Sequence, residues 1–156
     1  MWAPSGHNRQ PWHFLVIQDK EMLDRMSDFA VDRMRRSSLE WVRNLAGKDG
    51  YHLFHNAPTV IVVSGTHPDE PPLSALVDCS AAIQNMLVAA ESLDIGTCWI
   101  GLARFFFEDE KQLPSLRIPE GYRPLYSVAM GYKADDYIPT PMPRKSGTVS
   151  WYRRGE

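Results

Sequence analysis

The densest group of polar side chains lies in the loop at residues 3–12. Its sequence, Ala-Pro-Ser-Gly-His-Asn-Arg-Gln-Pro-Trp, places a hydroxyl, two amides and a guanidinium directly before a hydrophobic run. Loops on a rigid scaffold often carry binding residues, and ligand pockets combine a few such polar groups with apolar walls. This composition suits a polar, planar ligand. An ordinary loop rich in proline and glycine is the alternative.

Two further segments differ from ordinary core or tail. In 96–101, Gly-Thr-Cys-Trp-Ile-Gly, the last glycine allows the backbone to approach a bound group closely and expose its N–H. A glycine at a strand bulge is the alternative. Residues 143–154 carry four basic side chains and no acidic one. The adjacent Arg144 and Lys145 could grip a phosphate, and a solvated tail is the alternative.

No other pattern indicates a standard active site. The sequence contains no dinucleotide-binding glycine motif, phosphate loop, nucleophile elbow or Cys-x-x-Cys pair. His52 and His55 have the spacing of a partial metal site but no third ligand in register, which favours a solvated or capping pair. Cys98 has no base beside it and is predicted to be a small core residue. Arg35 and Arg36 are predicted to lie on the solvated face of a helix.

Length and composition indicate one domain over residues 1–156, because the chain is long enough to bury a core. The 17 Lys+Arg and 19 Asp+Glu give a formal net charge of −2, which provides no general attraction to nucleic acid or anionic membranes. Two cysteines are too few for a disulfide scaffold. There is no long apolar run and no signal-peptide pattern at the start. We therefore expect a cytoplasmic protein without nucleic-acid or membrane partners.

Hydrophobic periodicity predicts alternating strands and helices, with the helices layered on a small sheet. The predicted strands are 12–17, 59–64, 97–102 and 122–132. The predicted helices are 19–45, which begins at an Asp19 N-cap, 69–93 and 105–113.

The helix at 69–93 is apolar on nearly all sides between Ala75 and Ala90, which predicts a central, buried helix. Gln84 and Asn85 in its middle then need hydrogen-bond partners from another helix or a cofactor. Residues 134–156 contain three closely spaced prolines and are predicted to form an extended arm that does not pack on its own chain alone.

These segments resemble the nitroreductase family of FMN-dependent oxidoreductases. The loop at 3–12 is similar to the family's Ala-Pro-Ser-x-x-Asn-x-Gln-Pro-Trp segment, and 56–63 is similar to its next strand. Residues 78–101 resemble the long central helix and the flavin-contacting strand, and 121–132 resemble the last core strand. The resemblance therefore covers nearly the whole chain.

This resemblance implies an α+β fold with three layers, α/β/α, around a small mixed, mainly antiparallel sheet. It also implies an intimate homodimer with two FMN molecules at the interface, each contacted by both subunits. The arm at 134–156 is then expected to pack on the partner subunit.

The resemblance also implies FMN-binding roles at matching positions of this sequence. The loop residues expected to contact FMN, largely from the partner subunit, are Pro4, Ser5, Gly6 and Asn8, with Gln10 at the flavin edge or just behind it. The backbone at Ile100 and Gly101 is expected to lie against the isoalloxazine ring, with an N–H near N5 or O4. Arg144 and Lys145 are expected to bind the phosphate.

The implied activity is electron transfer from NADH or NADPH, through FMN, to a nitroaromatic, a quinone or a similar small-molecule acceptor in a ping-pong cycle. The chemistry then belongs to the flavin. No catalytic side chain is expected, in agreement with the missing catalytic motifs.

The start of the chain departs from the family pattern. Family members carry a helix and an Arg-Arg-Ser-x-Arg motif ahead of the loop, which supply phosphate and ribityl contacts, whereas here the loop follows Met1 almost directly. A second hypothesis is therefore an N-terminally shortened, non-catalytic dimeric member with weak or no FMN binding. A third is a flavin enzyme with a specialised substrate, such as a dehalogenase.

Overall fold

Four strands form the middle layer of the computed structural model, which describes residues 2–66, 73–138 and 140–152. They are β1 (Trp12–Ile17), β2 (Thr59–Thr66), β3 (Ile95–Ile100) and β4 (Tyr122–Tyr132), in the order β1-β2-β4-β3. Every hydrogen-bonded pair of these strands is antiparallel, so the sheet is not mixed as the resemblance implied. β2 and β3 run in the same direction, as expected for strands joined through a helix, but β4 lies between them.

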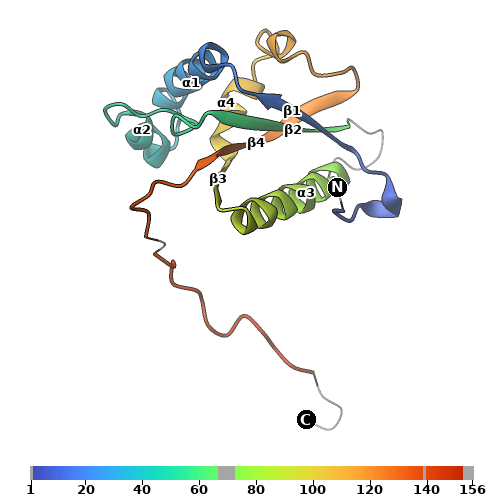
Figure 1. Ribbon diagram of the computed structural model, residues 1–156. Helices are drawn as coiled ribbons and strands as arrows, with labels where there is room; N and C mark the ends of the chain where they lie inside the picture. Colours follow the sequence, from blue (N-terminus) through green and yellow to red (C-terminus); the bar gives the residue numbers. More distant parts are fainter. Residues whose placement is uncertain (1, 67–72, 139, 153–156) are drawn as a thin grey trace.

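Helices cover both faces of this sheet, so the predicted three-layer α+β fold is confirmed (Figure 1). One face packs against α1 (Lys20–Arg35), α2 (Glu40–Ala46) and α4 (Arg104–Phe107). The other face packs against α3 (Leu73–Ser92). Along β2, Val60 and Val62 enter the first core and Val63 enters the second, which is why its sequence is almost continuously apolar.

The predicted helix at 19–45 is two helices. Asp19 caps α1 as predicted, with its carboxylate accepting a hydrogen bond from Met22 N at 2.9 Å. At Arg36 the backbone leaves the helical conformation (φ −101°, ψ 6°). The Ser37 hydroxyl then accepts a hydrogen bond from Leu39 N at 3.2 Å, and such serine-to-backbone bonds compete with helix continuation.

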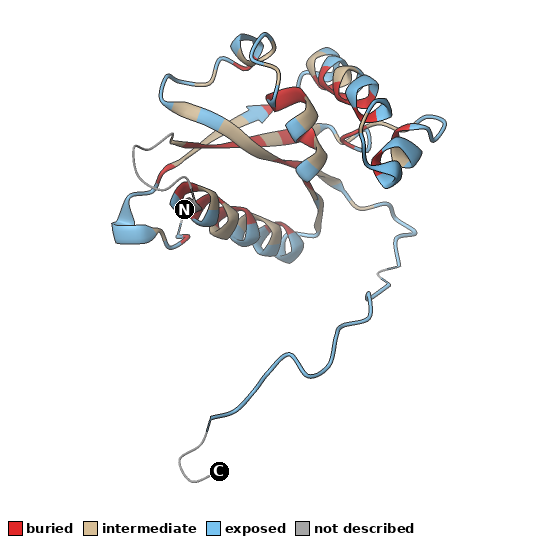
Figure 2. Cartoon of the chain, turned by 180° about the vertical axis from the view of Figure 1, so that it is seen from behind, coloured by how far each residue is buried: buried red, intermediate tan, exposed pale blue. Residues whose placement is uncertain are grey.

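The prediction that α3 is buried all round is wrong for the single chain. Its inner face is buried at Cys79 and Ile83, while Val77 and Val88 on its outer face are 57% and 60% exposed. Gln84 and Asn85 are also exposed. Figure 2 shows exposed residues along much of α3. Residues 69–72 of the predicted helix lie outside the described residues.

The strand predicted at 97–102 begins earlier and ends at Ile100, because Gly101 opens a short 3-10 turn, η2 (Gly101–Ala103). The helix predicted at 105–113 is also shorter than expected. α4 ends at Phe107, and after a loop the chain forms another 3-10 turn, η3 (Leu113–Leu116).

Beyond β4 the chain runs away from the three layers as an extended arm (Figures 1 and 2). All described residues in 134–138 and 140–152 are exposed. The packing of this arm on a partner subunit stays a prediction. In the described part of the chain, none of the helices combines the length and apolarity needed to cross a membrane.

Candidate functional site

The polar loop before β1 is organised around Ser5. A short 3-10 turn, η1 (Gly6–Asn8), follows this residue. Asn8 N donates to Ser5 O at 3.0 Å, and Gln10 N donates to Ser5 Oγ at 3.0 Å. The Gln10 amide in turn donates to Asn8 Oδ1 at 3.2 Å. The structure therefore brings the predicted loop residues together, and apart from Ser5, which is partly buried, they are exposed.

The backbone of this loop is strained. His7, Asn8 and Gln10 have φ values of 52°, 55° and 50°, in the left-handed region that residues with a side chain rarely occupy. Each such residue costs roughly 1–3 kcal/mol, and strain of this kind concentrates at ligand-binding sites, where it holds groups ready for a ligand. The loop is thus a preformed surface with exposed polar groups.

Asp78 attaches this loop to α3. Gly6 N donates to both carboxylate oxygens of Asp78, each at 3.2 Å, and Asp78 is buried. The sequence analysis did not single out Asp78. The available signal was that it is the only acidic residue between Ala75 and Ala90, in a mostly apolar stretch.

At the opposite edge of the sheet, the backbone at the end of β3 is exposed and has empty space beside it. Ile100 is buried at 5% exposure, whereas Gly101 is exposed, and a Cβ added to Gly101 would meet nothing within 4 Å. A flat group could therefore lie against this backbone.

The loop and the Ile100–Gly101 backbone do not form one site within a single chain. They belong to opposite edge strands, with β2 and β4 between them, and neighbouring strands are about 4.8 Å apart. They are also offset along the sheet. Trp12, the first residue of β1, pairs with Gly65 of β2, which pairs with Arg123 of β4. Ile100, the last residue of β3, pairs with Ser127, which lies further along β4.

Arg144 and Lys145 are exposed in the arm, which runs away from the three layers. The nine predicted site residues therefore form three separate groups in one chain.

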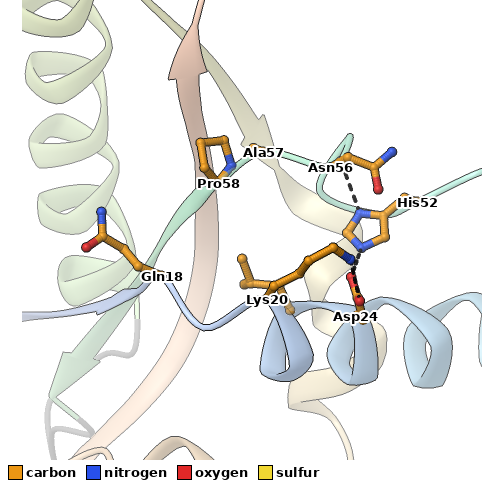
Figure 3. Close-up of a pocket in the computed structure, with 8 residues that line it drawn as sticks. Gln18, Lys20, Asp24, His52, Asn56, Ala57 and Pro58 are labelled. Atoms are coloured by element: carbon orange, nitrogen blue, oxygen red, sulfur yellow. Dashed lines mark hydrogen bonds and ion pairs between the residues drawn. The ribbon is translucent and has the colours of Figure 1, made fainter.

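A separate pocket of about 250 Å³ lies between the start of α1 and residues 52–58, and none of the predicted site residues lines it (Figure 3). His52 Nδ1 accepts hydrogen bonds from Phe54 N and Asn56 N, both at 3.2 Å, so His52 is a capping residue as predicted. His52 Nε2 lies 3.4 Å from Asp24 Oδ1, and Lys20 Nζ lies 2.6 Å from Asp24 Oδ2. The hydrogen bond from Lys20 lowers the pKa of Asp24. His52, Asp24 and Lys20 therefore interact with one another, which indicates a structural role.

The remaining candidates also receive structural explanations. Cys98 is exposed on β3, so its prediction as a core residue is wrong, and Cys79 is the buried cysteine. Arg36 is exposed and pairs with Asp32 at 2.6 Å, as expected on a solvated helix face. Over residues 2–66, 73–138 and 140–152, no three His, Cys, Asp or Glu side chains gather to hold a metal ion.

Comparison with known proteins gives a consistent result. The model of the family described as "Nitroreductase family" matches residues 1–132. A protein of Archaeoglobus fulgidus with the provisional name NADH dehydrogenase/NAD(P)H nitroreductase is 35% identical over 147 residues, which cover 87% of this chain and 69% of that protein.

Two solved structures share the fold closely. A nitroreductase with bound FMN from Bacteroides fragilis has a TM-score of 0.83 and 30% identity, covering 97% of this chain and 81% of its own. A nitroreductase with bound FMN from Desulfitobacterium hafniense also has a TM-score of 0.83, with 28% identity over 97% of this chain and 80% of its own.

Proposed function

Because the chain belongs to the nitroreductase family, we propose that it is an FMN-dependent NAD(P)H oxidoreductase that reduces small acceptors such as nitroaromatics and quinones. The observation that carries this proposal is the open backbone at Gly101 beside the buried Ile100. Similar proteins that are solved with bound FMN support the choice of cofactor.

The residues present fit FMN. Gly101 has no side chain in the open space beside it, so a flat ring could pack against the backbone there. The loop offers the Ser5 hydroxyl and the Asn8 and Gln10 amides for polar edges. Arg144 and Lys145 supply two cations for a phosphate, to which arginine and lysine bind by charge-assisted hydrogen bonds.

The chemistry that bound FMN would supply is two-electron transfer from NADH or NADPH to the acceptor, with the two substrates reacting in turn. The protein contributes binding and orientation. Ile100 and Gly101 would hold one face of the ring, and the strained loop would present polar groups without further reorganisation.

The proposed active form is a homodimer. The outer face of α3 exposes Val77 and Val88, Leu93 is exposed just after the helix, and the arm exposes Ile138 and Trp151. Large apolar surfaces of this kind are typical of protein interfaces. A symmetric dimer also explains how the loop of one chain could reach the β3 end of the other, since each chain supplies both halves.

The test begins with the purified full chain incubated with FMN and passed through a desalting column. We expect flavin absorbance to remain with the protein and NADH or NADPH oxidation to depend on an added nitroaromatic or quinone. Parallel double-reciprocal plots would support the ping-pong order, and comparing kcat/KM for NADH and NADPH would identify the donor. A dimer that retains no FMN and oxidises neither donor would contradict the proposal and favour a non-catalytic family member.

A further inference from the structure

We infer that Asp78 is a positioning residue, whose buried carboxylate holds the turn at Gly6–Asn8 against α3 and so sets the shape of the loop that meets the flavin. The inference rests on the proposed function, but the hydrogen bond that carries it lies within this chain. It concerns how the loop is held, and it does not make Asp78 a catalytic residue.

The contact joins two segments that are 72 residues apart. Both carboxylate oxygens of Asp78 lie 3.2 Å from Gly6 N and share its single proton. The other backbone bonds of the turn are local, from Asn8 N to Ser5 O and from Arg9 N to Gly6 O. Local bonds give the turn its shape, but they do not attach it to α3.

The burial of Asp78 makes its hydrogen bond to Gly6 important for stability. Asp78 is 9% exposed, and its neighbour Cys79 is fully buried. Burial raises the pKa of the Cys79 thiol to about 11, with a smaller contribution from the negative charge of Asp78. A carboxylate in such an apolar setting is unfavourable unless hydrogen-bond donors reach it. The Gly6 N–H is such a donor, so the charge and the turn stabilise each other.

The hydrogen bond between Asp78 and Gly6 affects the shape of the loop because the backbone of the turn is strained. His7 and Asn8, which follow Gly6 directly, both have positive φ values. Residues in this region stay there only when surrounding contacts outweigh the strain. Without the Asp78 carboxylate, we expect the turn to relax towards ordinary backbone angles and to lose its fixed arrangement.

The experiment compares Asp78→Ala and Asp78→Asn with the unaltered full chain. Alanine removes the acceptor, whereas asparagine keeps one oxygen in nearly the same place without the charge. The matched control is Glu91→Gln, the same acid-to-amide change near the other end of α3, where Glu91 Oε1 lies 2.9 Å from Lys133 Nζ. Amide hydrogen exchange over residues 5–10 is measured without FMN, and the FMN dissociation constant is measured separately.

We expect exchange in the turn to accelerate about 10-fold or more in Asp78→Ala, since a hydrogen bond to a charged acceptor is lost. The effect should be smaller in Asp78→Asn and absent in Glu91→Gln. The FMN dissociation constant should rise in the same order. If Asp78→Ala does not fold, the asparagine variant gives the same comparison at smaller amplitude.

Unchanged exchange in residues 5–10 of a folded Asp78 variant would overturn the inference. Faster exchange with unchanged FMN affinity would also overturn it, because the turn would then not be positioned for the flavin. If the unaltered chain binds no FMN, the proposed function fails, while the exchange measurement still decides whether Asp78 holds the turn.

Discussion

Gly101 is the residue where a side chain should hinder the cofactor without disturbing the fold. We expect Gly101→Val to raise the FMN dissociation constant at least about 10-fold, because the new side chain occupies the space proposed for the ring. The melting temperature without FMN should stay unchanged, since an added Cβ meets no neighbour within 4 Å.

The control for this variant is Glu110→Val, which places the same side chain at an exposed position outside the proposed site. It should change neither FMN affinity nor folding. Normal FMN binding by Gly101→Val would place the flavin elsewhere.

The two cysteines should differ sharply in reactivity. Burial raises the pKa of Cys79 from 9.0 to about 11, so its reactive thiolate fraction at pH 8 is about 100-fold lower than for an unperturbed thiol. Cys98 is exposed. A thiol reagent at pH 8 should therefore modify one thiol per native chain, and Cys98→Ser should remove this reaction. Cys79 should react only after unfolding, and its rapid labelling in the native protein would contradict the packing of α3.

Residue identity predicted some local features well and missed others. The polar loop and the open backbone at the glycine after β3 could be predicted because polar residues and glycine are unusual beside hydrophobic runs, and their binding roles stay predictions. Asp78 was missed because its role depends on a contact with Gly6, 72 residues away, that no local pattern records. Cys98 was misplaced because an apolar segment does not show which face of an edge strand is covered.

At the scale of elements, Gly65 sets the distance between β2 and α3. A Cβ at Gly65 would lie 2.9 Å from Leu125 Cδ1, 3.3 Å from Ala75 Cβ and 3.4 Å from Cys79 Sγ. Leu125 can rotate, but Ala75 and Cys79 belong to α3, so the helix would have to move. We expect Gly65→Ala to lower the free energy of unfolding by about 1–3 kcal/mol, as overpacking does in other cores.

Denaturant unfolding of Gly65→Ala measures this effect. Gly101→Ala is the matched control, because the same substitution there meets no atom within 4 Å. Equal stability of the two variants would show that α3 does not pack against β2 as described.

Most strands were predictable because their hydrophobic residues alternate with polar ones or form a short continuous run, as in β2. Helix ends were less predictable. The break between α1 and α2 arises from the Ser37 hydroxyl, which bonds to the backbone in place of a further helical turn. The apolar sequence of α3 indicated that most of its surface should be packed against other residues, but within one chain only its inner face is covered.

At the scale of the whole molecule, the arm should determine phosphate recognition. We expect the double variant Arg144→Ala/Lys145→Ala to raise the FMN dissociation constant about 10-fold or more, since charge-assisted bonds to the phosphate are lost. The affinity for riboflavin, which has no phosphate, should not change. Fluorescence quenching of both flavins measures this difference.

Lys48→Ala is the control for the loss of a positive charge, because Lys48 is exposed outside the arm. It should affect neither flavin. Equal weakening of FMN and riboflavin by the arm variant would indicate that the arm supports the fold or the dimer and does not bind the phosphate.

In the proposed active form the flavin is held by groups from two chains, since the loop and the β3 end lie at opposite edges of one sheet. Sedimentation of the FMN-loaded protein, followed at the flavin absorbance band, tests this directly. We predict that all bound flavin sediments with a species of twice the chain mass, at one FMN per chain. Flavin carried by a species of single-chain mass, or a dimer that sediments without flavin, would contradict it.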